Sequence, residues 1–235
     1  MNRDELWVCQ LGIVEYREAL ALQERLRAAR QAERVPDTLL LLEHWPVYTR
    51  GRRSDAGELP MGEPWYLDQG IDIVDTDRGG RVTYHGPGQL VGYPIMRIDD
   101  VIAYLRTIEI ALVVALADAG ISARARPDEG ADFTGVWTEG RKIASIGVHV
   151  SRAITTHGFA VNVQNDLQPF EWVIPCGLDG VSMTSVLKET QSSGELLAEF
   201  RELAAGRFAE AFGRRPRTIA ADELEVRIAP LPAGP

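Results

Sequence analysis

The sequence from residue 78 to residue 93 reads RGGRVTYHGPGQLVGY. Four glycines and one proline lie within residues 79–88, where glycine permits positive φ angles and lets the backbone approach a ligand closely. A phosphate-binding loop would lead into the N-terminus of a helix, whereas residues 90–95 are typical of a strand. The stretch therefore does not predict a nucleotide-binding loop. On spacing alone it is either the wall of another kind of site or an elaborate turn.

Further strands are predicted on both sides of this loop. Runs rich in apolar, β-branched and aromatic residues occur at 38–42, 71–74, 89–95, 133–138, 143–150 and 157–163. Residues 151–154 are a plausible hairpin connection between the last two runs. The central strands thus follow one another without helices between them, which favours a mixed or antiparallel sheet.

Helical periodicity appears in three other segments. The first runs from about Val14 to Ala32, and the second starts after Asp99-Asp100 and stops at Gly120. The third follows the capping-box pattern Ser192-x-x-Glu195 and ends near Gly213. With no linker or internal repeat in sight, we expect residues 1–235 to form one α+β domain with a mixed, largely antiparallel sheet and flanking helices.

Composition and charge limit the classes of function. The chain is 45% hydrophobic, lacks a long apolar run and has two cysteines, so we expect a cytoplasmic protein without a membrane span or a disulfide framework. A net charge of −9 argues against a nucleic-acid partner. Against that acidic background, Arg50, Arg52 and Arg53 form a basic stretch, which is either a set of solvated loop charges or a docking patch for an acidic macromolecule.

Two residues outside the glycine-rich loop could carry chemistry. Lys142 begins an apolar strand, where a lysine is usually only solvated. Cys176 lies in Pro175-Cys176-Gly177, at a predicted tight turn, although free cysteines are more often inert core residues. Cys9, in a strand-like context, is expected to be such a core residue. No two histidines have metal-ligand spacing, so we predict no metal site.

Taken together, these features closely resemble the lipoyl/octanoyl transferase family of lipoate biosynthesis. The stretch 78–93 is similar to that family's long signature. Supporting matches lie at 41–44, 49–52, 141–148, 156–158 with Asn162, and 175–177, so that the resemblance covers about residues 40–184.

The resemblance implies roles for individual residues. Cys176 matches the nucleophile that carries the acyl group as a thioester, and Lys142 matches the lysine of a Cys/Lys dyad. Three matching stretches would line the acyl-substrate site: Arg78, Gly79, Gly80, Arg81, Val82, Thr83, Tyr84 and His85; Ser145, Ile146 and Gly147; and Gly158, Phe159 and Ala160. The implied fold is the α+β domain shared with biotin and lipoate protein ligases.

The implied reaction moves an octanoyl group from octanoyl-acyl carrier protein to a lysine of lipoyl domains, including those of 2-oxoacid dehydrogenases and the glycine cleavage H protein. The thioester donor is already activated, so no cofactor is expected. A free cysteine with a pKa near 8.5 is only about 3% thiolate at neutral pH, and a neighbouring ammonium would raise that fraction. The lysine could then accept a proton from the incoming amine.

Three alternatives remain open on the sequence. An ATP-dependent lipoate- or biotin-protein ligase on the same fold would need a phosphate-binding loop and would not need Cys176. A non-catalytic module that binds acylated carrier protein would tolerate loss of either dyad member, whereas both are present. A thioesterase-like hydrolase differs only in using water as the acceptor.

Overall fold

A large mixed sheet forms the centre of the molecule. In a computed structural model, which describes residues 4–173, 181–192 and 194–229, eight strands pair in the order β11-β1-β2-β6-β10-β9-β8-β7. They are β1 (Glu5–Val14), β2 (Asp37–His44), β6 (Gln89–Ile95), β7 (Arg124–Ala125), β8 (Gly135–Thr138), β9 (Arg141–Ser151), β10 (Ile154–Asn162) and β11 (Arg215–Thr218). Among these eight described strands, the parallel pairs are β1 with β2 and β1 with β11, and the other five pairs are antiparallel. The sheet is therefore mixed and largely antiparallel, as expected.

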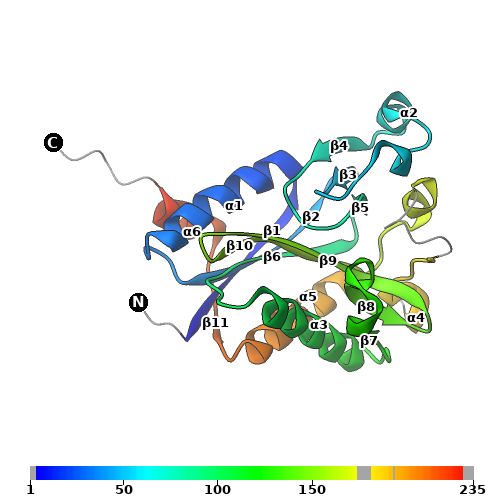
Figure 1. Cartoon of the computed structure of the whole chain (residues 1–235). Coiled ribbons are helices and arrows are strands. Elements are labelled where there is room, and N and C mark those ends of the chain that lie inside the picture. Colours follow the sequence, from blue (N-terminus) through cyan, green and yellow to red (C-terminus); the bar gives the residue numbers. More distant parts are fainter. Residues whose placement is uncertain (1–3, 174–180, 193, 230–235) are drawn as a thin grey trace.

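Helices cover both faces of this sheet (Figure 1). One face packs against α3 (Val101–Asp118) and α5 (Leu196–Ala211), and the other against α1 (Tyr16–Gln31) and α6 (Ala221–Ile228). Two phenylalanines of α5, Phe200 and Phe208, are almost fully buried. Each contributes about 1.5–3 kcal/mol by removing its ring from water.

Local sequence explains the two long helices that were predicted. Asp100 caps α3, because its carboxylate accepts hydrogen bonds from the backbone N–H groups of Ile102 and Ala103. Gly120, with φ of +81°, lies just past its end. The first helix buries Ala19, Leu22, Leu26 and Ala29, which recur at the spacing of one helical face.

A second, smaller sheet lies beside the first (Figure 1). It has the order β4-β3-β5, from β4 (Asp72–Asp75), β3 (Val47–Arg50) and β5 (Thr83–His85), and is accompanied by α2 (Glu63–Asp68). Its apolar side packs on the turn η4 (Gln168–Trp172), where the Tyr48 hydroxyl donates to the Pro169 carbonyl at 2.6 Å. The remaining elements are α4 (Val186–Thr190) and the turns η1 (Ala56–Glu58), η2 (Pro127–Glu129) and η3 (Ala131–Phe133).

One local prediction was wrong. The helix predicted from Ser192 begins at Leu196, and Glu195 is its N-cap residue without a side-chain cap hydrogen bond. The pattern Ser192-x-x-Glu195 therefore does not form a capping box, because Glu195 stands at the cap and not at the third helical position. In the described part of the chain, no helix has both the length and the apolar character needed to cross a membrane.

Candidate functional site

The glycine-rich loop is a crossing point of three backbone segments. The Gly79 N–H donates to the Val148 carbonyl at 3.0 Å, and the Arg53 N–H donates to the Gly80 carbonyl at 3.0 Å. A Cβ atom at Gly51 would lie 2.5 Å from the Gly80 carbonyl oxygen, closer than real Cβ atoms approach. Glycine is thus needed here so that the loop can pack against β9 and the segment after β3.

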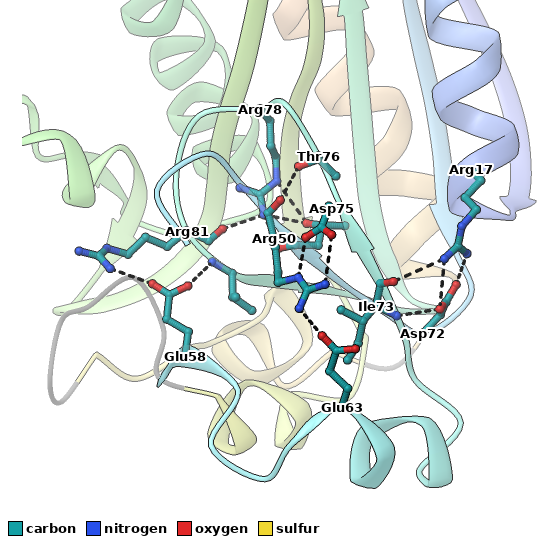
Figure 2. Close-up of polar contacts among 12 residues, drawn as sticks. Arg17, Arg50, Glu58, Glu63, Asp72, Ile73, Asp75, Thr76, Arg78 and Arg81 are labelled. Carbon is teal, nitrogen blue, oxygen red and sulfur yellow. Dashed lines mark hydrogen bonds and ion pairs between the residues drawn. The ribbon is translucent and has the colours of Figure 1, made fainter. Parts of the chain in front are cut away.

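Arg78 fastens this loop to the small sheet (Figure 2). Its guanidinium donates to the Thr49 hydroxyl at 2.7 Å, to the Thr49 carbonyl at 2.7 Å and to the Arg81 carbonyl at 2.8 Å. The side chain is only 7% exposed. A buried guanidinium needs such partners, so Arg78 determines the shape of the loop while also contributing to the cavity beneath it.

Apart from Tyr84, the predicted site residues that the structure describes come together around one cavity. Its walls are formed by Tyr16, Arg53, residues 78–83, His85, Tyr93, Ala131, Asp132, Thr134, Lys142, residues 145–147 and residues 157–160. Tyr84 is absent from these walls, since its ring packs between Tyr48 and Phe170 in the small-sheet core. The three predicted stretches thus share one site apart from Tyr84, and their substrate-binding role stays a prediction.

Lys142 is a buried member of this cavity wall. Its side chain is 4% exposed, and its ammonium lies 5.3 Å from the centre of the Trp137 ring. The backbone N–H of Lys142 donates to the Ser182 carbonyl at 2.9 Å, and its carbonyl accepts from the Thr184 N–H at 3.0 Å. The expectation that a lysine at a strand entrance is merely solvated therefore fails here, because the Lys142 side chain is buried in the cavity wall.

Cys176 lies outside the described residues, but both flanks of residues 174–180 are hydrogen-bonded to the rest of the fold, the first to the small-sheet core and the second to the cavity wall. Before them, Tyr66 donates its hydroxyl to the Trp172 carbonyl at 2.7 Å. After them, Ser182 pairs with Lys142. The other cysteine, Cys9, is fully buried in the core beneath α1, and burial raises the pKa of its thiol to about 11. Cys9 is therefore the inert core thiol that was expected.

Two histidines, His85 and His157, line the cavity, and a third, His44, contacts the wall residues Tyr16, His85 and Tyr93. His157, buried and with φ of +58°, contacts Asp77 at 2.8 Å between Nε2 and a carboxylate oxygen. Burial lowers the pKa of His157 despite this carboxylate, and the hydrogen bond from His157 lowers the pKa of Asp77. His44 ends β2 and is fully buried, bonded to the Val14 carbonyl and to the Tyr93 hydroxyl. His85 stacks on Tyr16.

Acidic side chains neutralise most of the predicted basic patch (Figure 2). Arg50 binds Asp75 at 2.6 Å and also pairs with Glu63. Arg53 pairs with Asp132 at 2.8 Å. Arg52 is exposed and has no ion pair among the described residues. The positive charge of Arg50 is therefore largely compensated by Asp75 and Glu63, and the docking role of the basic stretch stays a prediction.

Several wall residues could not have been found from local sequence. Tyr16 begins α1, and Asp132 belongs to the short turn η3; neither stands in a chemical motif. Tyr93 and His157 lay inside quoted stretches without being singled out. Among the described residues, no three His, Cys, Asp or Glu side chains gather in a way that could hold a metal ion.

A family model of the lipoyl protein ligase A/B catalytic domain matches residues 15–209, which include every described wall of this cavity. The chain belongs to the lipoyl protein ligase A/B family. Within that family it is similar to a protein of Geobacter sulfurreducens named octanoyltransferase, with 46% identity over 217 residues, which cover 89% of this chain and 88% of that protein. An octanoyltransferase of Mycobacterium tuberculosis (strain ATCC 25177 / H37Ra) is 48% identical over 188 residues, or 77% and 76% of the two chains.

The fold of this ligase A/B family member is also found in solved structures. The crystal structure of lipoate-protein ligase A bound with ATP superposes with a TM-score of 0.79 at 20% identity, covering 95% of this chain and 92% of that one. At that identity the likeness shows the fold alone. It confirms the lipoate-ligase type of α+β architecture that the sequence resemblance implied.

Proposed function

We propose that this chain is an octanoyltransferase of lipoate biosynthesis, acting on lipoyl domains. Relatives that are 42–49% identical carry the name octanoyltransferase. The structural observation that supports the chemistry is Lys142, a lysine buried in the wall of a cavity and paired with the segment that follows residues 174–180. A lysine that is buried in a cavity wall can exchange a proton with a group bound in the cavity, whereas an exposed lysine is mainly hydrated.

The proposed reaction has two halves. In the first, the Cys176 thiolate attacks the thioester carbon of octanoyl-acyl carrier protein, so that a C–S bond to Cys176 forms and the bond to the carrier sulfur breaks. The Lys142 ammonium stabilises the Cys176 thiolate and gives a proton to the departing carrier thiolate. The resulting neutral amine of Lys142 then takes a proton from the attacking lysine of the lipoyl domain. The new amide bond releases Cys176 as a thiolate, and the starting charges are restored.

The cavity walls suit an apolar chain. Val82, Ile146, Phe159 and Ala160 supply apolar surface, and burying the methylenes of an octanoyl chain at about 0.8 kcal/mol each gives roughly 5 kcal/mol. We further propose that the acceptors include the lipoyl domains of 2-oxoacid dehydrogenases and the glycine cleavage H protein. We assign the enzyme to the cytoplasm, because a reducing compartment keeps the Cys176 thiol available.

Intact-protein mass after incubation with octanoyl-acyl carrier protein tests this mechanism. We expect an octanoyl adduct that hydroxylamine removes and that a lipoyl domain discharges. Cys176→Ala should lose both the adduct and the transfer, while Cys9→Ala, which removes only the buried thiol, should keep both. Full transfer by the Cys176→Ala protein would refute the covalent route, and a strict requirement for ATP would support the ligase alternative.

Lys142→Met isolates the second member of the dyad. Without the ammonium, the pKa of Cys176 should rise and transfer should fall steeply, because one pKa unit corresponds to about 1.4 kcal/mol of thiolate stabilisation. The rate of thiol alkylation as a function of pH measures this directly. Superimposable Cys176 titrations in the two proteins would show that Lys142 does not stabilise the thiolate.

A further inference from the structure

A series of hydrogen bonds between buried groups connects His85 to Lys142 behind the cavity wall. Asn162 is the last residue of β10 and pairs in register with Gln89, the first residue of β6. Both side chains are 2% exposed. Buried amides must satisfy their hydrogen bonds within the protein, so the partners of Asn162 and Gln89 can be followed one by one.

The direction of each hydrogen bond follows from a backbone carbonyl. The Thr184 carbonyl can only accept, so the amide nitrogen of Asn162 donates to it at 3.0 Å. The Asn162 amide oxygen then accepts from Gln89 Nε2 at 3.0 Å, and the same nitrogen donates to the Tyr84 carbonyl at 3.1 Å. Gln89 Oε1 is therefore the atom 2.7 Å from His85 Nδ1, and that nitrogen must carry the proton.

The His85 ring is thereby fixed in one tautomer. With the proton on Nδ1, Nε2 keeps its lone pair and can accept a hydrogen bond but cannot give one. Burial, together with the nearby His44, holds the pKa of His85 well below its ordinary value, so the ring stays neutral. His85 therefore contributes a neutral imidazole with a defined acceptor nitrogen to the cavity wall.

The other end of this hydrogen-bond series holds the backbone of Lys142. Strand β10 makes its last pair with β9 at Val161 and Ala144, so β10 does not reach Lys142. The segment 182–184 takes the next place along β9, through a parallel bridge between Met183 and Lys142. The Asn162 amide, by binding the Thr184 carbonyl, joins the end of β10 to this substitute strand.

We propose that Asn162 is a positioning residue, which holds Lys142 through Thr184 and fixes the orientation of Gln89 and hence the tautomer of His85. The proposal rests on the proposed function for the role of Lys142. Removing the Asn162 amide leaves the Thr184 carbonyl without its side-chain donor and loosens the segment 182–184, which is hydrogen-bonded to the backbone of Lys142. A displacement of the lysine by even 1 Å is enough to cost about tenfold or more in rate.

Asn162→Ala tests the connection, with Asn165→Ala as its matched control. Asn165 is also buried, at 6% exposure against 2% for Asn162, and donates to the Asn162 oxygen at 3.3 Å, but it does not lie on the path between His85 and Lys142. For Asn162→Ala we expect kcat with a small octanoyl thioester to fall about tenfold or more and KM to change less than about twofold. The alkylation profile of Cys176 should move toward that of Lys142→Met, and Asn165→Ala should keep the wild-type profile. Equal behaviour of the two alanine variants would overturn the proposal.

Two further measurements keep the test decisive. If Asn162→Ala does not fold, Asn162→Asp replaces it: a protonated carboxyl can donate to the Thr184 carbonyl and an ionised one cannot. Its kcat relative to wild type should therefore rise as pH falls, and a flat ratio would overturn the proposal. Nitrogen-15 chemical shifts of labelled histidine should show the Nδ1–H tautomer at His85. An Nε2–H tautomer would refute the assigned hydrogen-bond directions, independently of the Cys176 alkylation result. If Lys142→Met leaves the Cys176 titration unchanged, the proposed Cys/Lys dyad is refuted. The His85 tautomer then still tests the proposed series of hydrogen bonds.

Discussion

Acid should destabilise this protein through a histidine at the end of β2. His44 is fully buried, and its Nδ1 donates to the Val14 carbonyl at 2.8 Å. That leaves Nε2 as the acceptor for the Tyr93 hydroxyl at 2.7 Å, so protonating the ring would disturb the bond to Tyr93. Burial lowers the pKa of His44 to about 4, from an ordinary value of 6.5.

The sign and size of the effect follow from this difference. Because the folded pKa lies below the unfolded one, the unfolded chain binds the proton more readily as pH falls. The contribution of His44 is fully present above pH 6.5 and is lost as pH falls from about 6.5 to about 4. Lowering the pKa from 6.5 to about 4 corresponds to about 3 kcal/mol, at about 1.4 kcal/mol per pH unit.

His44→Gln provides the comparison, because an amide can occupy the site without titrating. The free energy of unfolding, measured by urea titration between pH 4 and pH 8, should fall with acid more steeply in wild type than in this variant. The gap between the two curves should close by up to about 3 kcal/mol across that range. Burial also lowers the pKa values of His85 and His157, but they remain in both proteins. Parallel curves would refute this assignment to His44.

Two other outcomes can be measured separately. Gly92→Ala would place a Cβ 2.2 Å from the Phe159 ring. We therefore expect the free energy of unfolding to fall by roughly 1–3 kcal/mol or more, with a clearly lower unfolding temperature. Gly206→Ala, in α5 with nothing within 4 Å, should instead stabilise the protein by up to about 1 kcal/mol, and equal effects would contradict this steric account. Arg52→Glu should raise KM for the acidic carrier-bound donor several-fold but not for a small octanoyl thioester, because Arg52 has no ion pair among the described residues; Arg50→Glu should not show this selectivity. Equal losses with both donors would remove the docking role.

Periodic segments were predictable because their packing is local. The strand 89–95 and the helix after Asp100 have clear patterns, and both appear at those positions. Strand β11 was not predictable, since Arg215–Thr218 is exposed along its length, contains a proline and forms only by pairing with β1. The capping box at Ser192 failed because α5 begins at Leu196, which places Glu195 at the cap position and not at the third helical position.

The site was predictable only in part. The resemblance indicated the stretches that meet at the cavity, but it gave no sign that Tyr84 packs into the small-sheet core. Ion pairs were equally hidden, because the partners of Arg50 are 13 and 25 residues away in the chain. Contacts of that kind are fixed by the fold and leave no local pattern in the sequence.

The placement of Lys142 illustrates how irregular sheet geometry exposes a lysine to a cavity without exposing it to solvent. The pairing of β8 with β9 shifts register between Val136–Ala144 and Trp137–Lys142, so that β9 has one extra residue, Ile143, next to Lys142. Such a bulge re-aims the side chains around it. Gly135, with φ of +139°, leaves room for the lysine stem, because a Cβ there would lie 2.9 Å from Lys142 Cε and 2.4 Å from the Ala144 carbonyl oxygen. On the other side β10 stops early, and the segment 182–184 completes the pairing. The bulge, the glycine and the short strand thus together account for the buried position of the Lys142 side chain in the cavity wall.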